Sequence, residues 1–271
     1  MSIALSGAII LKILSYQGTP YSTDIKKNLD VVEETALAAS TLNIDVLVFP
    51  ELFVTGYNIG EQVKVLAQPL DGEICRTLQR IASQKSVSII IGFPEREGDS
   101  IFNSAIAIDK HGQIVGHHRK VFLFGDQEKA LFAPGGNFTT FNINGYQCGI
   151  SICYDIEFPE AIRELAKKGA QIIFNPTANM FPYVEIPKTL ARARALENGV
   201  VVVYSNLCGE ENGLRYTGLS AIISPEGIDL ARAGEEPAIL ISDIPKNVKK
   251  NIKNIYSTQL LDLAASKFKN A

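Results

Sequence analysis

The sequence has few of the residues that metal centres and disulfide frameworks need. Its 271 residues include only 3 histidines and 4 cysteines, and no Cys-x-x-Cys pair or histidine cluster occurs among them. A zinc site has little to be built from, so we expect no metal and no cofactor. The four cysteines are scattered through apolar surroundings, which favours free thiols and a reducing, cytoplasmic location. Any chemistry should come from Cys, Glu, Asp, Lys or Ser side chains.

An excess of charge of either sign is also lacking. The chain has 26 Lys and Arg against 29 Asp and Glu, a formal net charge of −3, and 46% of its residues are apolar. This balance argues against disorder and against binding to nucleic acid. The stretch 2–15 is fairly apolar, but it carries Lys12, lacks a preceding basic segment and is too short to span a bilayer. We therefore expect neither a nucleic-acid partner nor a membrane partner.

Short β-branched runs alternate with helical patterns along the chain, without repeats or linkers. This order is typical of an α/β protein with one domain over residues 1–271. Several of the strands are apolar without alternation, so other layers should cover both of their faces. Strands are predicted at 9–16, 45–50, 86–93, 102–109, 112–119, 147–155, 171–176 and 201–206, helices at 24–42, 72–84, 159–168 and 184–198, and irregular chain at 125–136.

Cys153 is a candidate nucleophile because of its place in the chain. It follows the apolar residues 149–152 and precedes the helix predicted from residue 159. Strand ends are where open α/β sheets place their sites, and a nearby helix N-terminus would lower the pKa of the thiol. By residue type alone, a Cys beside an apolar strand is more often a small buried hydrophobe, the interpretation kept for Cys75, Cys148 and Cys208.

Two further residues follow predicted strands and carry charges suited to catalysis. Glu51 comes directly after the strand at 45–50, and a carboxylate beside apolar chain would have a raised pKa and could shuttle protons. Lys120 follows the strand at 112–119 and precedes a run of apolar residues, an unusual setting for a Lys. Glu128 lies close enough in sequence to pair with Lys120. Taken singly, each of these residues could also lie on the surface.

A base, a cation and a nucleophile at strand ends together describe a site for acyl transfer. A Cys–His arrangement would instead need His111, His117 or His118. A serine nucleophile would need a Gly-x-Ser-x-Gly elbow, which is absent, because the stretch that starts at Gly149 ends in Cys153. The residues alone leave open whether a carboxylate or an imidazole serves the thiol.

Three blocks of sequence, in this order, carry a resemblance to a known family. They are DVLVFPELFVTGYNIG around Glu51, HHRKVFLFGDQEKALFAPG around Lys120, and GISICYDIEFPEAIRELAKKGAQIIFNPTANM around Cys153. A fourth block, ARARALENGVVVVYSNLCG, has Arg194, Glu197 and Asn206 in characteristic places. Over nearly its whole length the chain resembles the nitrilase superfamily of carbon–nitrogen hydrolases. The resemblance implies a four-layer α-β-β-α sandwich that forms a homodimer or a higher homo-oligomer through its helical layers.

The resemblance also implies roles for these side chains. Cys153 would be the nucleophile and Glu51 the general base, while Lys120 would face the oxyanion and Glu128 would hold Lys120 and substrate. The partner would then be a small-molecule amide, cleaved through a Cys thioester. Substrate-binding candidates by their position in the family-like blocks, each equally plausible as core, are Tyr57, Tyr154, Phe158, Asn179 and Met180.

Three alternatives accompany the amidase prediction. Nitrilases usually have Trp then Glu after the nucleophile, whereas Tyr154 and Asp155 follow Cys153 here, so an amidase is favoured over a nitrilase. Acyl transfer to an acceptor other than water would use the same thioester. A non-catalytic scaffold is disfavoured because all three triad positions are filled. The natural substrate and its stereochemistry cannot be read from the sequence.

Glu157 bears on the charge of the substrate. Relatives that hydrolyse amides of dicarboxylic acids often carry Arg at this position, where a cation could favour an anionic substrate. A carboxylate there would instead repel an anionic substrate, unless Glu157 faces solvent or pairs with Arg163 on the following helix. We therefore expect neutral or cationic short-chain amides to be preferred.

Overall fold

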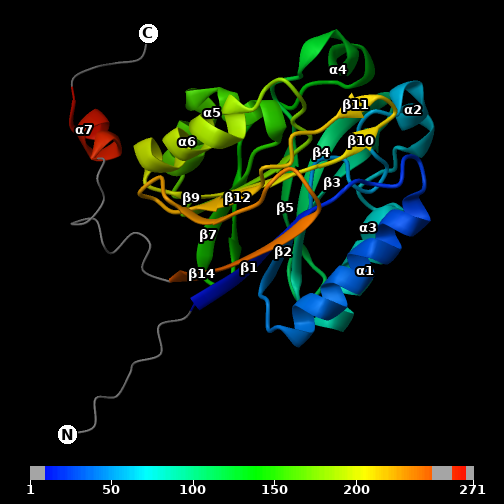
Figure 1. The fold of residues 1–271 in the computed structure, drawn as a ribbon, viewed down its shortest axis with the longest axis horizontal. Coiled ribbons are helices and arrows are strands. Elements are labelled where there is room, and N and C mark those ends of the chain that lie inside the picture. Colours follow the sequence, from blue (N-terminus) through cyan, green and yellow to red (C-terminus); the bar gives the residue numbers. More distant parts are fainter. Residues whose placement is uncertain (1–9, 246–257, 267–271) are drawn as a thin grey trace, which may run out of the picture.

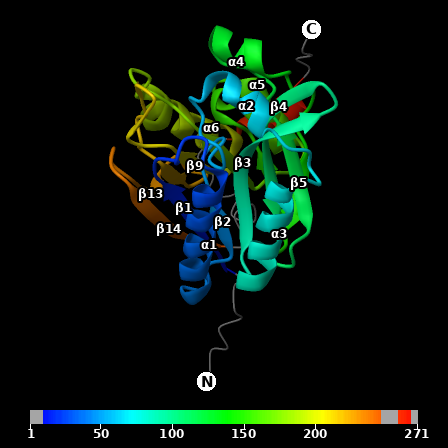
Figure 2. The same ribbon diagram turned by 90° about the vertical axis from the view of Figure 1, so that its right-hand side faces the viewer.

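The computed structural model describes residues 10–245 and 258–266, which form two sheets packed face to face between two helical layers (Figure 1). Figure 2 shows the helices α1 and α3 on the outer side of the first sheet. This arrangement is the expected four-layer α-β-β-α sandwich, which confirms the predicted fold class.

Each sheet has a parallel centre and antiparallel edges. The first, in spatial order, contains β14 (Ala238–Pro245), β1 (Ile10–Gln17), β2 (Val46–Val48), β3 (Ser88–Glu97), β4 (Ser100–Ile108) and β5 (Ile114–Arg119), with β1, β2 and β3 parallel. The second contains β13 (Asp229–Arg232), β12 (Ala221–Ile223), β9 (Val201–Asn206), β8 (Ile172–Thr177), β7 (Tyr146–Ile150) and β6 (Thr140–Ile143), with β7, β8 and β9 parallel. The strands β10 (Glu210–Glu211) and β11 (Leu214–Arg215) form a separate hairpin.

The helices divide between the two outer faces. The first sheet is covered by α1 (Ile25–Thr41) and α3 (Glu73–Lys85), and the second by α5 (Pro159–Lys167) and α6 (Ala191–Asn198). Asp24 caps α1, since its carboxylate accepts a hydrogen bond from the backbone N–H of Lys27 at 3.0 Å. Shorter elements are η1 (Gly60–Gln62), α2 (Val63–Leu66), α4 (Gly125–Leu131), η2 (Cys153–Glu157), a π-helical segment (Ile186–Leu190) and α7 (Gln259–Ala265).

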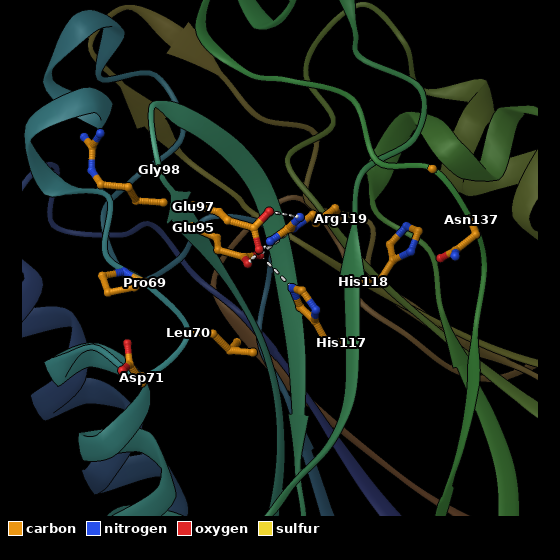
Figure 3. Close-up of a pocket in the computed structure, with 12 residues that line it drawn as sticks. Pro69, Leu70, Asp71, Glu95, Glu97, Gly98, His117, His118, Arg119 and Asn137 are labelled. Atoms are coloured by element: carbon orange, nitrogen blue, oxygen red, sulfur yellow. Dashed lines mark hydrogen bonds and ion pairs between the residues drawn. The ribbon is translucent and has the colours of Figure 1, made fainter.

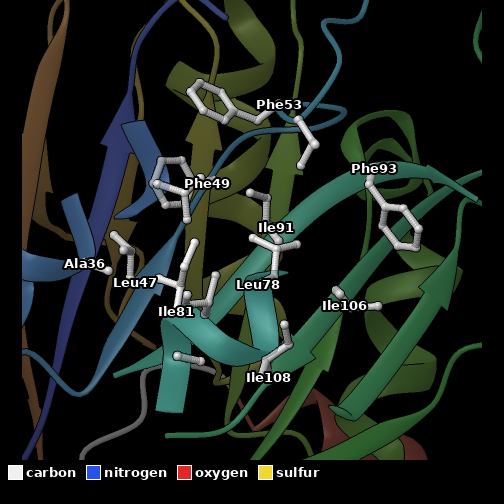
Figure 4. Packing of buried hydrophobic residues seen from close by; sticks show 14 of the residues in the cluster. Ala36, Leu47, Phe49, Phe53, Leu78, Ile81, Ile91, Phe93, Ile106 and Ile108 are labelled. Carbon is white, nitrogen blue, oxygen red and sulfur yellow. The ribbon is translucent and has the colours of Figure 1, made fainter. Parts of the chain in front are cut away.

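Three apolar layers explain why the inner strands read as unbroken hydrophobic runs. Between the sheets lies a cluster that includes Ile13, Val48, Ile90, Ile150 and Phe174. Outer clusters join each sheet to its helices, and Figure 4 shows the one in which Leu78 and Ile81 of α3 pack over strands of the first sheet. Strands such as β2, β8 and β9 are buried along their whole length because both of their faces are covered.

Three expectations from the sequence need correction. The strand predicted over 147–155 ends at Ile150, and the chain then turns into the 3₁₀ segment η2. The stretch 125–136 is not wholly irregular, because α4 forms at its start, where Glu128 Oε2 accepts from the backbone N–H of Phe124 at 2.8 Å. The helix predicted over 184–198 is not α-helical throughout, because it starts as the π-helical segment Ile186–Leu190 and continues as α6. No helix in the described part of the chain has the length and apolarity of a membrane span.

Candidate active site

Three strand ends bring the candidate side chains to one edge of the sandwich. Glu51 and Cys153 each lie just beyond a parallel strand, β2 and β7, and Lys120 directly follows β5. The backbone N–H of Glu51 donates to Thr177 O, at the end of β8 in the other sheet, at 3.4 Å. The carboxyl ends of strands from both sheets therefore meet where open α/β sheets place their sites.

The ammonium group of Lys120 lies between two carboxylates. Its Nζ is 2.7 Å from Glu51 Oε1 and 2.7 Å from Glu128 Oε1, and the Lys120 and Glu51 side chains are fully buried. Burial alone would lower the pKa of Lys120, but Glu128 and Glu51 raise it well above its ordinary value. Lys120 is therefore a fixed cation, which stabilisation of an oxyanion requires.

Glu51 is held through only one of its carboxylate oxygens. Oε1 accepts from Lys120 Nζ and from Asn103 Nδ2, each at 2.7 Å. Oε2 is buried and accepts no hydrogen bond from the described residues. Desolvation raises the pKa of the Glu51 carboxyl, Lys120 lowers it, and Glu128 raises it further. A buried oxygen without a donor, on a group with a raised pKa, suits a general base.

Gly92 on β3 allows the chain at Glu51 to pass close by. A Cβ atom on Gly92 would lie 2.4 Å from Leu52 N and 2.9 Å from Glu51 Cα. Any side chain at this position would push the Glu51 backbone away from Lys120.

Cys153 occupies a sharp turn after β7. Its φ of +44° is in the left-handed region, which residues other than glycine rarely adopt. Arg194 of α6 holds the segment that follows, donating to the carbonyls of Ile156 at 2.9 Å and Glu157 at 2.8 Å. Cys153 is partly buried, whereas the other three cysteines are fully buried, and all four are free thiols.

The expected lowering of the Cys153 pKa by a helix N-terminus is wrong. Burial has the largest effect and raises the pKa of the thiol, Glu51 raises it too, and Lys120 lowers it. The helix α5 begins only at Pro159, beyond η2, and the field of a helix end acts mainly within its first turn. A thiol with a raised pKa needs a base to take its proton as the sulfur attacks.

The histidines do not form the alternative Cys–His arrangement. His117 Nε2 lies 2.6 Å from Glu95 Oε2, and His118 Nε2 lies 2.8 Å from Asp155 Oδ2. His111 is exposed on the turn between β4 and β5. The charges that act on the thiol of Cys153 belong instead to Glu51, Lys120 and Glu128. The structure thus favours a carboxylate over an imidazole as its partner.

A cavity of about 420 Å³ lies beside this charged cluster. Tyr57 connects the two, because it lines the cavity and its hydroxyl donates to Glu128 Oε1 at 2.7 Å. Phe124, Met180 and Tyr183 also line the cavity, and Asp126 is the only charged residue among the described lining residues. Asn58, Gln127 and Asn212 add polar side chains. A cavity with aromatic and apolar walls and some polar groups is typical of a small-molecule site.

The five substrate-binding candidates are placed differently. Tyr57 and Met180 line the cavity. Tyr154 lies next to it, with its ring edge-on to Phe124 at 5.3 Å between centroids. Phe158 stacks on Phe122 at 3.7 Å, and Asn179 Nδ2 donates to Tyr183 O and Thr217 Oγ1, so both serve packing and backbone structure. Their roles toward substrate stay predictions.

Sequence reasoning missed two polar residues that shape the site. Asn103 on β4 donates to Glu51, and Glu211 of the β10–β11 hairpin accepts from the backbone N–H groups of Tyr57 at 3.1 Å and Asn58 at 2.8 Å. Glu211 lies 154 residues from Tyr57 in sequence. Neither residue adjoins a recognisable motif, so no local signal could have identified it.

A larger cavity, of about 740 Å³, lies apart from this cluster (Figure 3). Its walls include Glu95, His117 and Arg119, and the carboxylate of Glu95 pairs with both His117 and Arg119. Salt bridges from His117 and Arg119 lower the pKa of Glu95 to about 2 although burial opposes this. The described residues contain no group of three or more His, Cys, Asp or Glu side chains that could hold a metal ion. Metal independence stays a prediction.

A protein-family model described as carbon–nitrogen hydrolase matches residues 12–253. The chain belongs to the carbon–nitrogen hydrolase family. One relative, named "Hydrolase in pqqF 5'region" in Pseudomonas protegens, is 39% identical over 91% of this chain and 87% of its own length. A second, named nitrilase, from Pyrococcus abyssi, is 36% identical over 89% of this chain and 92% of its own length.

A solved carbon–nitrogen hydrolase structure shares the fold. It is a mutant of the amidase from Nesterenkonia sp. AN1, with a TM-score of 0.84 and 31% identity over 94% of this chain and 96% of that one. Its active-site cysteine carries the acetamide moiety of fluoroacetamide as a covalent addition. The family recognised in the three sequence blocks is therefore confirmed.

Proposed function

We propose that this protein is a thiol-dependent amidase that hydrolyses a small non-peptide amide to a carboxylic acid and ammonia or an amine. The observation that carries the proposal is the buried cluster around Lys120, in which Glu51 keeps Oε2 without a hydrogen-bond donor among the described residues. The charges of Glu51 and Lys120 both act on the thiol of Cys153. A base, a fixed cation and a nucleophile are thus assembled in one place.

In the proposed reaction, the sulfur of Cys153 attacks the amide carbon while Glu51 takes the thiol proton. The negative charge that collects on the carbonyl oxygen faces the ammonium of Lys120 and the backbone N–H of Tyr154. The tetrahedral intermediate collapses to a thioester, and Glu51 gives its proton to the leaving nitrogen. Water then attacks the thioester as Glu51 takes a proton from the water. The carbon–sulfur bond breaks, the carboxylic acid leaves, and Glu51 returns the proton to the sulfur of Cys153.

A panel of substrates tests this proposal. Amides, nitriles of the same acyl chain, and an amide together with an amine acceptor would be assayed for ammonia and for the acyl product. We expect release of ammonia and acid from the amide, with little turnover of the nitrile and little transfer to the amine. Turnover of the nitrile alone would favour the nitrilase alternative, and an acyl-amine product would favour acyl transfer.

Labelling of the thiols distinguishes a catalytic protein from the non-catalytic scaffold alternative. Cys153 is the least buried of the four cysteines, and Glu51, whose charge acts on its thiol, can take the thiol proton as the sulfur reacts. Iodoacetamide should therefore modify Cys153 before the buried Cys75, Cys148 and Cys208. Uniform slow labelling of all four thiols, together with no turnover of any substrate in the panel, would support a scaffold.

We further propose that neutral or cationic amides are preferred to monoamides of dicarboxylic acids. Asp126 lines the cavity, and Glu157 lies near enough to the site for Lys120 to lower its pKa, although burial raises it. Glu157 forms no ion pair with Arg163, which donates instead to the carbonyl of Glu197 at 2.9 Å. A carboxylate on the substrate about 10 Å from either side chain would be disfavoured roughly 2- to 15-fold.

The comparison of kcat/KM for butyramide, succinamate and 4-aminobutyramide measures this preference. Succinamate should be the poorest substrate, most clearly at low salt, where charges are least screened. Asp126→Asn and Glu157→Gln should each raise kcat/KM for succinamate. Asp99→Asn, at an exposed site outside this cavity, should not raise it. If succinamate is the best substrate of the native protein, the charge argument is wrong.

We also propose that the protein forms a homodimer or a higher homo-oligomer. Each chain would be one domain over residues 1–271, and the protein would work in the cytoplasm. Leu196 of α6 is 37% exposed, Ile228 just before β13 is 59% exposed, and Leu230 within β13 is 44% exposed. Gly227 lies against Leu196. Large apolar side chains exposed together favour association. The four free thiols fit a reducing compartment.

Light scattering at micromolar concentration tests the assembly. We expect at least a dimer for the native protein and dissociation in Ile228→Glu, because a charge would be buried in the interface. Val65→Glu, at a residue on α2 that is 83% exposed, is the matched control and should not dissociate. A native monomer would overturn the proposed oligomer.

A further inference from the structure

Two adjacent histidines on β5 point to opposite faces of the first sheet. Figure 3 shows the ring of His117 directed toward Glu95 and the ring of His118 turned the other way. The side chain of His117 is 29% exposed, whereas that of His118 is 2% exposed and lies 2.8 Å from the carboxylate of Asp155. The two residues thus make similar imidazole–carboxylate pairs in different places.

The buried carboxylate of Asp155 accepts four hydrogen bonds. Oδ1 accepts from the backbone N–H groups of Val121 at 3.1 Å and Phe122 at 2.9 Å. Oδ2 accepts from the backbone N–H of Ile152 at 3.0 Å and lies 2.8 Å from His118 Nε2. Asp155 itself is fully buried, so these bonds are not exchanged with water.

These backbone groups adjoin the two reactive side chains. Val121 directly follows Lys120, and Ile152 directly precedes Cys153. One carboxylate therefore connects the segment that carries the ammonium group to the segment that carries the thiol. If the Asp155 carboxylate turned, it would release one segment or the other.

His118 can fix this carboxylate because the only hydrogen-bond contact of its ring among the described residues is with Asp155. Its Nδ1 is buried and has no partner among the described residues, and its ring stacks on Phe138 at 5.1 Å. An ionised carboxylate can only accept hydrogen bonds, so the Nε2 atom that faces Asp155 Oδ2 carries a proton and donates it.

We propose that His118 and Asp155 are positioning residues that set the distance between Lys120 and Cys153. This inference rests on the proposed thiol amidase function. Neither residue touches substrate. The Asp155 carboxylate holds the backbone beside each reactive side chain, and His118 holds the carboxylate. A misplacement of about 1 Å in such a site lowers turnover by roughly 100-fold.

Variants of the two histidines separate positioning from general structure. Glutamine at position 118 places an amide N–H near the site of Nε2, whereas the shorter asparagine does not reach Asp155. We expect His118→Asn to lower kcat roughly 10- to 100-fold with KM changed less than about threefold. His118→Gln should keep kcat within about threefold of native, and the matched control His117→Asn should be close to native.

Alkylation of Cys153 by iodoacetamide gives a readout that needs no amide turnover. Because Lys120 lowers the pKa of Cys153, a displaced ammonium group should slow alkylation in His118→Asn and not in His118→Gln. If His118→Asn does not fold, His118→Leu, which fills the space without a donor, replaces it with the same expectations.

Equal losses of kcat in His118→Asn and His118→Gln would overturn the inference, and so would a loss as large in His117→Asn. A change confined to KM would also overturn it. If the native protein hydrolyses no amide, the proposed function fails, and the alkylation rates alone then decide whether His118 sets the position of the thiol.

Discussion

Replacing Cys153 with alanine is expected to lower kcat for an amide by at least about 10⁴-fold, because no other nucleophile is placed to form the acyl-enzyme. The other three cysteines are fully buried, and neither Glu51 nor Lys120 is among the groups that act on their thiols. They cannot take over the reaction. Steady-state assays of purified Cys153→Ala, with circular dichroism to confirm folding, measure the effect.

Cys75→Ala is the matched control for this variant. It removes a thiol from the cluster between α1, α3 and the first sheet and should leave kcat near that of the native protein. Its effect should be confined to stability, because it leaves a small cavity in a packed core. More than about 1% of native activity in Cys153→Ala would remove Cys153 from the role of nucleophile.

Replacing Lys120 with glutamine is expected to lower kcat by about 10²- to 10³-fold, with a smaller change in KM. Charge on the substrate oxygen develops only as the transition state is approached, so the loss appears in kcat. The variant also leaves Glu51 and Glu128 buried without their cation, so its thermal stability should fall. Weaker substrate binding with an unchanged kcat would contradict this role for Lys120.

The pH dependence of kcat/KM offers a paired test of the same cluster. Glu51 must be ionised to act as a base, so activity is lost as pH falls through its pKa. Lys120 lowers that pKa and Glu128 raises it. The acid limb should therefore move to higher pH in Lys120→Gln and to lower pH in Glu128→Gln. Shifts of the same sign in both variants would remove Glu51 from the role of base.

Local patterns predicted most of the fold because the central strands of both sheets are buried on both faces. The apolar runs at residues 172–174 and 201–204 lie in strands that the structure buries between the other sheet and a helical layer. The candidate residues could also be found from the sequence, since a charged residue close to the end of an apolar strand is conspicuous. Glu51 lies just beyond β2, and Lys120 directly follows β5.

Other features of the site could not be predicted from the sequence, because they depend on contacts between segments that are distant in the chain. The turn at Cys153 has a positive φ, and no glycine marks it. The pKa of its thiol depends on burial by layers that come from both halves of the chain, so the local helix argument gave the wrong sign. Asp155 lies 34 residues from Val121, and its partners become apparent only when β5 and β7 are placed in space.

The most direct test of the central claim is to trap the acyl-enzyme. The native protein would be mixed with an activated amide such as a short-chain p-nitroanilide, quenched in acid within milliseconds and examined by intact-protein mass spectrometry and peptide mapping. The account predicts one acyl group per chain, on the peptide that contains Cys153, formed before steady-state turnover and absent in Cys153→Ala. Hydrolysis that proceeds with no adduct, or with the acyl group on another residue, would contradict it.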